Sequence, residues 1–366
     1  MDLASVSCFL AGGGDSPDGW TAIKPILLVK VTAEDGTIGW GEAYVLTGRT
    51  KAVGALIQAL GGGFRGRPAT PRAFREFAFR EFGDRRGGID FFAALSAIEL
   101  ALWDLLGRQL EAPVHRLLGG ALRERIPLYA NVWSTKEPSP EAIVARCREH
   151  VAAGFHALKL YPAELPSLDD AEMLLERLRE VLDPTVTLMV DVNGLEDPQE
   201  ALLMARRFRS YDIYWLEEPV SSDDLATLAE IRQFSGMRIV SGERHGGKAP
   251  FRDILKSRAA DILNPDIAGA GGIVEFLEIA ALAEAHSARV SPHCYNSMSV
   301  AFAAMLQVSA VLPNLAWAEY FPALQAASDA FAKLDSNIVD GHASLPMSPG
   351  LGATPDENRL RPFTTA

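Results

Sequence analysis

Three acidic residues close three apolar runs in the middle of the chain at equal intervals. Asp191 follows VTLMV, Glu217 follows IYWL and Glu243 follows RIVSG, and successive members are 26 residues apart. One strand, one helix and their connections take about that many residues. Because parallel strands of an α/β barrel present their carboxyl ends at the same mouth, we expect the three carboxylates to converge there.

Converging carboxylates repel one another strongly in a buried mouth, since a low dielectric raises the cost of unpaired charge. A hard divalent cation relieves this repulsion, and oxygen-only ligands suit Mg²⁺. A single acidic residue at a strand end is usually a helix cap or a solvated charge. Three at one interval on consecutive strands are better explained by a metal, so the spacing predicts that Asp191, Glu217 and Glu243 bind Mg²⁺.

The series continues with residues suited to proton transfer. Asp266, His293 and Glu319 close the next three runs. An aspartate beside a histidine can fix the tautomer of the ring and raise its basicity, so we predict that His293 and Asp266 act as a catalytic pair. Lys159 ends the second run and Tyr161 follows two residues later, so both should share one face of the strand. A buried lysine needs a negative partner, such as a metal-bound carboxylate or enolate, and we predict both residues as catalytic.

A regular alternation of apolar runs and amphipathic segments must position these residues. Parallel strands need crossover helices and are buried on both faces, so eight such runs predict an α/β fold with a parallel barrel. The runs are PLYAN (127–131), HALKL (156–160), VTLMVDVN (186–193), IYWLEEP (213–219), RIVSGE (238–243), DILNPD (261–266), RVSPHC (289–294) and LAWAEYF (315–321). The clearest helical segments are 169–181, 197–208, 225–234 and 273–285.

The first third of the chain has strands followed by helices. The runs 26–32 and 37–40 flank a Glu-Asp-Gly turn and predict a hairpin, and helical patterns follow around 71–82 and 91–109. This order predicts a small α+β domain over residues 1–125, then the barrel over 126–322 and a C-terminal segment, 323–366, that returns to the first domain. We interpret the glycine runs at 11–14 and 61–63 as loops, and the GAGG of 269–272 as a tight turn.

Composition limits the class of protein. The 366 residues carry a formal charge of −12, which argues against nucleic acid and anionic membranes as partners. Cys8, Cys147 and Cys294 lie far apart, so a disulfide framework is not expected. We find no secretory signal and no apolar segment long enough to span a bilayer, and we predict a cytoplasmic protein.

Together, the motifs of this chain resemble those of the enolase superfamily, and within it the mandelate racemase subgroup. The resemblance implies an α+β N-terminal capping domain over a (β/α)7β TIM-type barrel in a homo-oligomer. It rests on TIGWGE (37–42), SAIELALWDLLGR (96–108), LLGG (117–120), GFHALKLYP (154–162), DVN (191–193), WLEEP (215–219), SGE (241–243), NPD (264–266) and SPH (291–293).

The resemblance also implies roles for individual residues. It assigns Asp191, Glu217 and Glu243 to Mg²⁺, in agreement with their spacing, and it matches Asp266 and His293 to the Asp–His dyad of the subgroup.

Substrate contacts and one departure from the family pattern follow from the same motifs. Glu319 corresponds to the acidic group beside the substrate carboxylate, Asn193 is a second predicted substrate contact, and Glu218 is implied to lie behind the metal ligands. Racemases of the subgroup typically carry two lysines, K-x-K, on the second strand, the second of them a base. Here Tyr161 stands in that second place, after Lys159.

The missing second lysine favours a reaction that needs only one base. We therefore predict an acid-sugar dehydratase, a lyase that forms a 2-keto-3-deoxy acid by β-elimination of water. His293 could serve as both base and acid in a syn elimination, or Tyr161 could share the work in an anti elimination. The alternative is a racemase or epimerase, or a cycloisomerase of a sugar-acid lactone, with Tyr161 as a base.

Two alternative functions belong to other classes of protein. A Schiff-base aldolase could use Lys159 as its nucleophile on the same barrel. A catalytically silent binding protein would keep the core without the ring of charged residues. We expect the substrate to be chosen by loops near 12–20 and 44–49.

Overall fold

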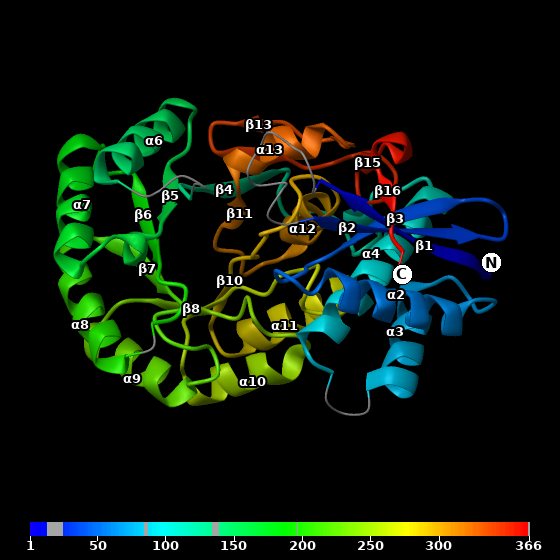
Figure 1. Cartoon of the computed structure of the whole chain (residues 1–366), viewed down its shortest axis with the longest axis horizontal. Helices are drawn as coiled ribbons and strands as arrows, with labels where there is room; N and C mark the ends of the chain where they lie inside the picture. The colour runs from blue at the N-terminus through cyan, green and yellow to red at the C-terminus, as the bar shows by residue number, and fades with distance from the viewer. Residues whose placement is uncertain (13–24, 84–86, 134–138, 196, 365–366) are drawn as a thin grey trace.

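The computed structural model describes residues 1–12, 25–83, 87–133, 139–195 and 197–364, and it has the mixed α/β class that the sequence predicts. Figure 1 shows a β-rich N-terminal region, in blue and cyan, beside a ring of strands and helices coloured green to orange. Among the described residues, the structure has no helix that is both long and apolar enough to cross a membrane.

The N-terminal region is an antiparallel sheet covered by helices. Its strand order is β16-β1-β2-β3, and the predicted hairpin is β2–β3. The strands are β1 (Leu3–Ala11), β2 (Ile26–Ala33), β3 (Ile38–Ala43) and β16 (Arg361–Pro362). The helices are α2 (Thr50–Phe64), α3 (Pro71–Ala78), α4 (Ile89–Gln109) and α5 (Val114–Leu117), with a π-helical turn at Phe79–Gly83.

The interpretation of the glycine run at 61–63 as a loop is wrong, because these residues lie inside α2. A Cβ atom on Gly61 would come within 2.7 Å of the Val6 Cβ, and one on Gly63 within 2.9 Å of the Phe77 ring. The glycines therefore allow α2 to approach β1 and α3 closely, and close packing outweighs their low helix propensity. Of the run at 11–14, residues 13 and 14 lie outside the described residues.

From Arg125 onward, eight parallel strands of the described chain alternate with seven helices. The strands are β4 (Arg125–Asn131), β5 (Ala157–Leu160), β6 (Thr187–Asp191), β7 (Ile213–Glu217), β8 (Ile239–Ser241), β9 (Ile262–Leu263), β10 (Arg289–Val290) and β11 (Ala318–Tyr320). The helices are α6 (Pro140–Ala152), α7 (Leu168–Val181), α8 (Pro198–Phe208), α9 (Leu225–Ser235), α10 (Lys248–Ser257), α11 (Gly272–Ala285) and α12 (Val300–Val311).

Hydrogen bonds close these strands into a ring. Each strand from β4 to β9 pairs in parallel with the next, and β11 pairs in parallel with β4. The remaining gap is bridged where the Ala316 N–H donates to the Val290 carbonyl over 2.7 Å. The ring therefore has no open edge between β10 and β11.

Alternation along the strands places the polar residues at one end of the ring interior. Six strands each contribute one side chain to a small apolar cluster: Tyr129, Ala157, Met189, Trp215, Val240 and Ile262. Residues two positions further along a strand share its face. Asn131, Lys159, Asp191, Glu217 and Asn264 follow members of this cluster at that spacing, so they occupy the layer above it.

Two buried glutamates of the N-terminal region bind the first turns of ring helices. Glu42, on β3, accepts hydrogen bonds from the N–H of Ser297 (2.7 Å), just before α12, and from the N–H of Ala301 (3.0 Å), in the first turn of α12. The first N–H groups of a helix have no partner within the helix, and the helix dipole favours a negative charge beside them. Glu42 therefore fastens β3 to α12.

Glu99, on α4, makes the equivalent contact with α11. Its carboxylate accepts from the N–H groups of Ile273 (2.8 Å) and Val274 (3.1 Å). Gly272 has φ +78°, and a Cβ there would come within 2.1 Å of the carboxylate. The GAGG segment therefore forms a tight turn into α11 that leaves room for Glu99.

The end of the chain runs along both regions. Strand β14 pairs antiparallel with β4, β16 pairs antiparallel with β1, and Phe363 joins the N-terminal apolar core. The elements are α13 (Pro322–Asp329), β12 (Ala332–Leu334), β13 (Ile338–Val339), β14 (His342–Ser344) and β15 (Ala353–Pro355).

Candidate active site

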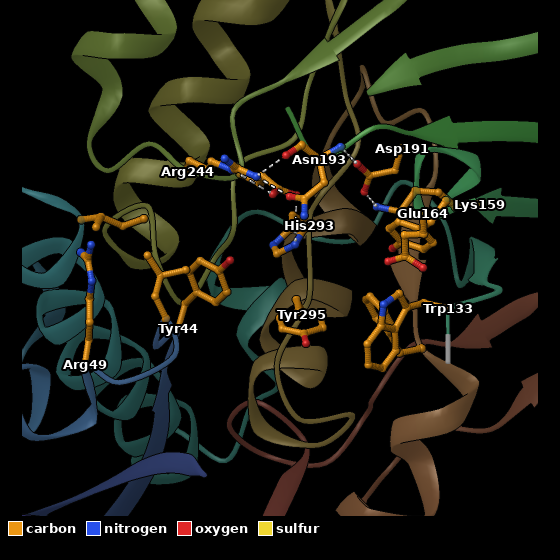
Figure 2. Close-up of a pocket in the computed structure, with 15 residues that line it drawn as sticks. Tyr44, Arg49, Trp133, Lys159, Glu164, Asp191, Asn193, Arg244, His293 and Tyr295 are labelled. Carbon is orange, nitrogen blue, oxygen red and sulfur yellow. Dashed lines mark hydrogen bonds and ion pairs between the residues drawn. The ribbon is translucent and has the colours of Figure 1, made fainter. Parts of the chain in front are cut away.

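Side chains from the ring mouth and from the N-terminal region enclose a cavity of about 530 Å³ (Figure 2). Figure 2 shows Lys159, Asp191 and Trp133 on one side, with Tyr44 and Arg49 on the other. The lining residues are Tyr44, Leu46, Arg49, Ile89, Trp133, Lys159, Tyr161, Glu164, Asp191, Asn193, Glu243, Arg244, His293, Tyr295 and Phe321. The predicted segment 44–49 therefore reaches the cavity, whereas residues 13–20 of the other predicted segment lie outside the described residues.

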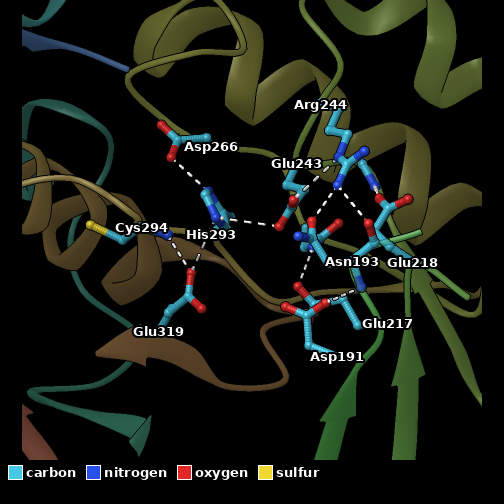
Figure 3. Close-up of polar contacts among 12 residues, drawn as sticks. Asp191, Asn193, Glu217, Glu218, Glu243, Arg244, Asp266, His293, Cys294 and Glu319 are labelled. Carbon is cyan, nitrogen blue, oxygen red and sulfur yellow. Dashed lines mark hydrogen bonds and ion pairs between the residues drawn. The ribbon is translucent and has the colours of Figure 1, made fainter. Parts of the chain in front are cut away.

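The three carboxylates predicted to bind metal meet at this mouth (Figure 3). Asp191 and Glu217 end the paired strands β6 and β7 and are register partners, and Glu243 lies two residues beyond β8. One oxygen from each lies within 4.8 Å of the others, as a shared cation would require. Asp191 and Glu217 are buried, and Glu243 is partly buried.

The electrostatics of this triad fit a cation. Burial raises the pKa of Asp191 to about 6 and that of Glu217 well above its usual value, and the neighbouring carboxylates add to both shifts while Lys159 opposes them. Within the described structure, Glu217 Oε2 is buried without a hydrogen-bond partner. An oxygen-only donor set with an unsatisfied buried oxygen suits a hard divalent ion.

Lys159 lies between these acids and Glu319. Its Nζ is 3.2 Å from Asp191 Oδ2, 3.0 Å from Glu217 Oε1 and 2.7 Å from Glu319 Oε1. Burial lowers the pKa of Lys159, but Glu217 and Glu319 outweigh that effect and hold the pKa well above its usual value. The side chain is therefore an ammonium group that donates to three carboxylates.

His293 and Asp266 form a buried pair next to the triad. Asp266 Oδ2 lies 2.7 Å from His293 Nδ1, and Asn296 donates to both Asp266 oxygens, at 3.1 and 2.8 Å. An ionised aspartate can only accept, so Nδ1 carries a proton and donates to Asp266. The other ring nitrogen, Nε2, is 3.3 Å from Glu243 Oε2, which aims it at the triad (Figure 3).

Opposing effects set the protonation of His293 and Glu319. Burial lowers the pKa of His293, but Glu319, Glu243 and Asp266 together raise it to about 9. Burial raises the pKa of Glu319, but Lys159, His293 and the Cys294 N–H lower it to about 2. Glu319 is therefore a carboxylate at neutral pH.

The remaining predicted residues also line the cavity. Asn193 has φ 56°; its N–H donates to Asp191 Oδ1 (2.9 Å), and its side-chain and main-chain oxygens accept from Arg244. Tyr161 donates its hydroxyl proton to Asn131 Oδ1. The structure thus brings all nine predicted site residues to one mouth; their individual roles remain predictions.

Glu218, the second acid of WLEEP, is not a member of the acidic triad and is bound by the neighbouring strand end. Its Oε1 accepts from Ser241 Oγ at 3.0 Å and from the Gly242 N–H at 2.9 Å. Glu218 thereby shapes the strand end that carries Glu243.

Several residues in or beside the cavity were missed by the sequence interpretation. Asn131 closes the first apolar run, as the other site residues close theirs, so the same periodic signal could have identified it. Asn264, which donates to Glu217 Oε1 at 2.9 Å, stands in the NPD motif. Trp133 and Glu164 lie in connections with no comparable pattern; the Trp133 side chain donates a hydrogen bond to Glu164, whose pKa is raised by burial.

Two family models match the chain. Residues 21–119 match the N-terminal domain of the mandelate racemase / muconate lactonizing enzyme family, and residues 142–359 match the enolase C-terminal domain-like family.

Among curated proteins, the chain is similar to dehydratases and a cycloisomerase by name. The chain is 32% identical to a D-gluconate dehydratase of Thermoproteus tenax, over 92% of this chain and 69% of the relative. It is 30% identical to a D-galactonate dehydratase of Xanthomonas oryzae pv. oryzae and to a D-galactarolactone cycloisomerase of Agrobacterium fabrum, in each case over 92% of this chain and 90% of the relative.

Solved structures agree over nearly the whole chain. An enolase from Sargasso Sea environmental sequencing matches with a TM-score of 0.93 and 33% identity, over 98% of this chain and 95% of the other. A 3,6-anhydro-D-galactonate cycloisomerase from Zobellia galactanivorans matches with a TM-score of 0.89 and 27% identity, over 98% of each chain.

Proposed function

The chain belongs to the mandelate racemase / muconate lactonizing enzyme family, and from that premise we propose that it removes the α-proton of a sugar-acid carboxylate and eliminates water, giving a 2-keto-3-deoxy acid. The observation that carries the proposal is a single buried His–Asp pair aimed at three carboxylates that suit Mg²⁺. Two relatives that are dehydratases of sugar acids by name support the same reaction.

We infer that the closed ring is the (β/α)7β barrel of this family and that the N-terminal region is its α+β cap. The alternation of β4 to β11 with seven helices supports the barrel over residues 126–322. Pairing of β16 with β1 supports a C-terminal segment, 323–366, that completes the cap of residues 1–125. A homo-oligomer remains a prediction from the family resemblance.

Asp191, Glu217 and Glu243 would hold Mg²⁺. The α-hydrogen of a carboxylate is a very weak acid, so most of the barrier is the negative charge that develops on the substrate carboxylate. A bound dication supplies electrostatic stabilisation of that charge. Lys159 contributes a second positive group beside it, oriented by Glu319.

His293 Nε2 would take the proton from Cα while Asp266 holds the opposite ring nitrogen. Burial favours the neutral ring of His293, whereas Glu319, Glu243 and Asp266 raise its pKa. A cation that neutralises Glu243 would remove one of these contributions and so favour the free imidazole that a base requires. In the elimination, the electron pair of the broken Cα–H bond forms a double bond to Cβ as the Cβ–O bond breaks. The proton on Nε2 then leaves with the hydroxyl as water, and the enol becomes a keto acid.

Epimerisation or lactone cycloisomerisation is the second candidate, since two similar proteins are cycloisomerases by name. Both would begin with the same transfer of the α-proton. In epimerisation the proton would then return to the opposite face of Cα, whereas in lactone cycloisomerisation the bond to the ring oxygen would break and that oxygen would leave as the carboxylate. The Schiff-base alternative is weaker, because an amine nucleophile must lose its proton and Lys159 is paired with three carboxylates.

A screen of aldonates, aldarates and their lactones with Mg²⁺ tests the proposal. We expect keto-acid formation from at least one of them, together with exchange of the α-hydrogen in deuterated water. Exchange that never yields keto acid would exclude dehydration, and inversion at Cα would favour the epimerase.

A further inference from the structure

Asn131 connects three neighbouring strands below the cavity. It ends β4, between Lys159 on β5 and Glu319 on β11, and its side chain is 2% exposed. Its Nδ2 donates to Glu319 Oε1 at 2.9 Å and to the Tyr320 carbonyl at 3.4 Å. A buried amide in this position has both of its ends engaged.

The partners of Asn131 permit only one orientation of its amide. Glu319 is a carboxylate that already accepts from Lys159 (2.7 Å) and from the Cys294 N–H (2.6 Å), and the Tyr320 carbonyl can only accept. Reversing the amide would place Oδ1 against these oxygens and leave two buried acceptors without a donor, which is costly. Oδ1 must therefore face Tyr161.

This orientation determines what Tyr161 can offer to a ligand. The Asn131 Oδ1 is an acceptor only, so the Tyr161 hydroxyl must donate its single proton to it. Tyr161 lines the cavity and is partly buried, so the hydroxyl oxygen still has lone pairs for a second partner. Burial raises the pKa of Tyr161 well above its usual value, although Lys159 acts to lower it. The raised pKa keeps the proton on the hydroxyl.

We propose that Asn131 is a positioning residue that holds the Tyr161 hydroxyl as a hydrogen-bond acceptor toward the cavity. Tyr161 then selects sugar acids that present a hydroxyl donor on the β5 side and does not exchange a proton with the substrate. This inference rests on the proposed function for the class of ligand. It leaves His293 to carry the proton transfers alone, as in a syn elimination.

Fluorinated ligands distinguish an accepting tyrosine from a donating one, because a C–F group cannot donate. The ligand is the sugar acid that the screen identifies, and each hydroxyl beyond Cβ is replaced by fluorine in turn. Calorimetry with Mg²⁺ gives Kd for each analogue. For one position we expect the wild-type Kd to rise about tenfold, the loss of one hydrogen bond.

The Tyr161→Phe variant should bind the parent acid about tenfold more weakly and no longer distinguish it from that fluoro analogue. Its rate of α-hydrogen exchange at saturation should fall by no more than about tenfold, the worth of one hydrogen bond to the ligand, and the shape of its pH profile should be retained. A proton-transfer role would instead cost about 10² to 10⁴ in that rate. Such a loss, or equal wild-type Kd values for all analogues, would overturn the proposal.

Asn131→Leu and the double variant test the positioning role. Asn131→Leu should weaken binding and reduce discrimination against the fluoro analogue, and adding it to Tyr161→Phe should change Kd little further. Additive losses would show that Asn131 acts through Glu319 alone and overturn its proposed role. Discrimination in Kd without any α-hydrogen exchange would refute the proposed reaction but leave this inference standing.

Discussion

One ammonium group, that of Lys159, faces three buried carboxylates, and this excess of negative charge has a measurable consequence. Lys159 donates to Asp191 and Glu217, yet Glu217 Oε2 stays buried without a partner in the described structure. Residues arranged for binding commonly cost stability until their ligand arrives. The site should therefore be stabilised by Mg²⁺ and strained without it.

Glu217→Gln keeps the shape of the side chain and removes its charge. In wild type, Mg²⁺ at a hundred times its Kd should stabilise the fold by about 2.7 kcal/mol, and the variant should lose that increment. Without metal, the variant should be at least as stable as wild type, because one like charge is gone. Thermal unfolding with and without Mg²⁺ measures both. Glu164→Gln, a cavity carboxylate outside the triad, is the control and should keep the Mg²⁺ increment.

His293→Asn should separate metal binding from chemistry. With no base aimed at the triad, the rate of α-hydrogen exchange should fall about a thousandfold, the range expected for a lost general base. The Mg²⁺-dependent rise in thermal midpoint should remain, since His293 is not a predicted ligand. Exchange at the wild-type rate in this variant would remove His293 from the mechanism.

At the scale of elements, Glu99 links α4 to α11 and gives the fold a pH dependence. Burial raises the pKa of Glu99 to about 7, although three N–H groups donate to the carboxylate. The unfolded chain has a pKa near 4.5. A raised folded-state pKa contributes stability fully below pH 4.5 and loses it as pH rises to about 7.

Glu99→Gln cannot titrate, so its stability relative to wild type should change over that window. The unfolding free energy of wild type minus that of the variant should decrease between pH 5 and pH 7, by at most roughly 1.4 kcal/mol per pH unit, and level off above. Urea unfolding at several pH values measures the difference. Glu284→Gln, at an exposed position on α11, should show a constant difference from wild type. A constant difference for Glu99→Gln as well would refute the shift.

The ends of the ring strands could be predicted from the sequence because each site residue follows an apolar run at a repeated interval. Asp191, Glu217 and Lys159 therefore meet where the sequence places them. Helix α2 was missed because its glycines indicate a loop, and only contact with Val6 and Phe77 explains them. Glu164 lies in a short connection, where neither periodicity nor spacing carries a signal.

On the scale of the whole molecule, the end of the chain completes the N-terminal core. Phe363 packs against α2 so closely that a Cβ on Gly54 would lie 2.3 Å from its ring, and its N–H donates to the Cys8 carbonyl at 2.9 Å. Phe363→Ala should therefore cost about 3 kcal/mol. Unfolding measurements should show this loss, whereas the exposed control Thr364→Ala should stay within about 0.5 kcal/mol. A loss as small as that of the control would mean that the final strand is not needed for this core.

The carboxylates of Glu42 and Glu99 reach from the N-terminal region to α12 and α11, and from these bonds we expect a restriction on how molecules enter and leave the cavity. Rigid-body movement of the N-terminal region away from the ring would leave both buried carboxylates and the helix N–H groups without their hydrogen-bond partners. We therefore expect ligands to enter and leave through small rearrangements at the rim, for example of the segment from Tyr44 to Arg49, which lines the cavity. Motion of that rim would then limit the rate of product release, while the N-terminal region and the ring of strands stay in contact.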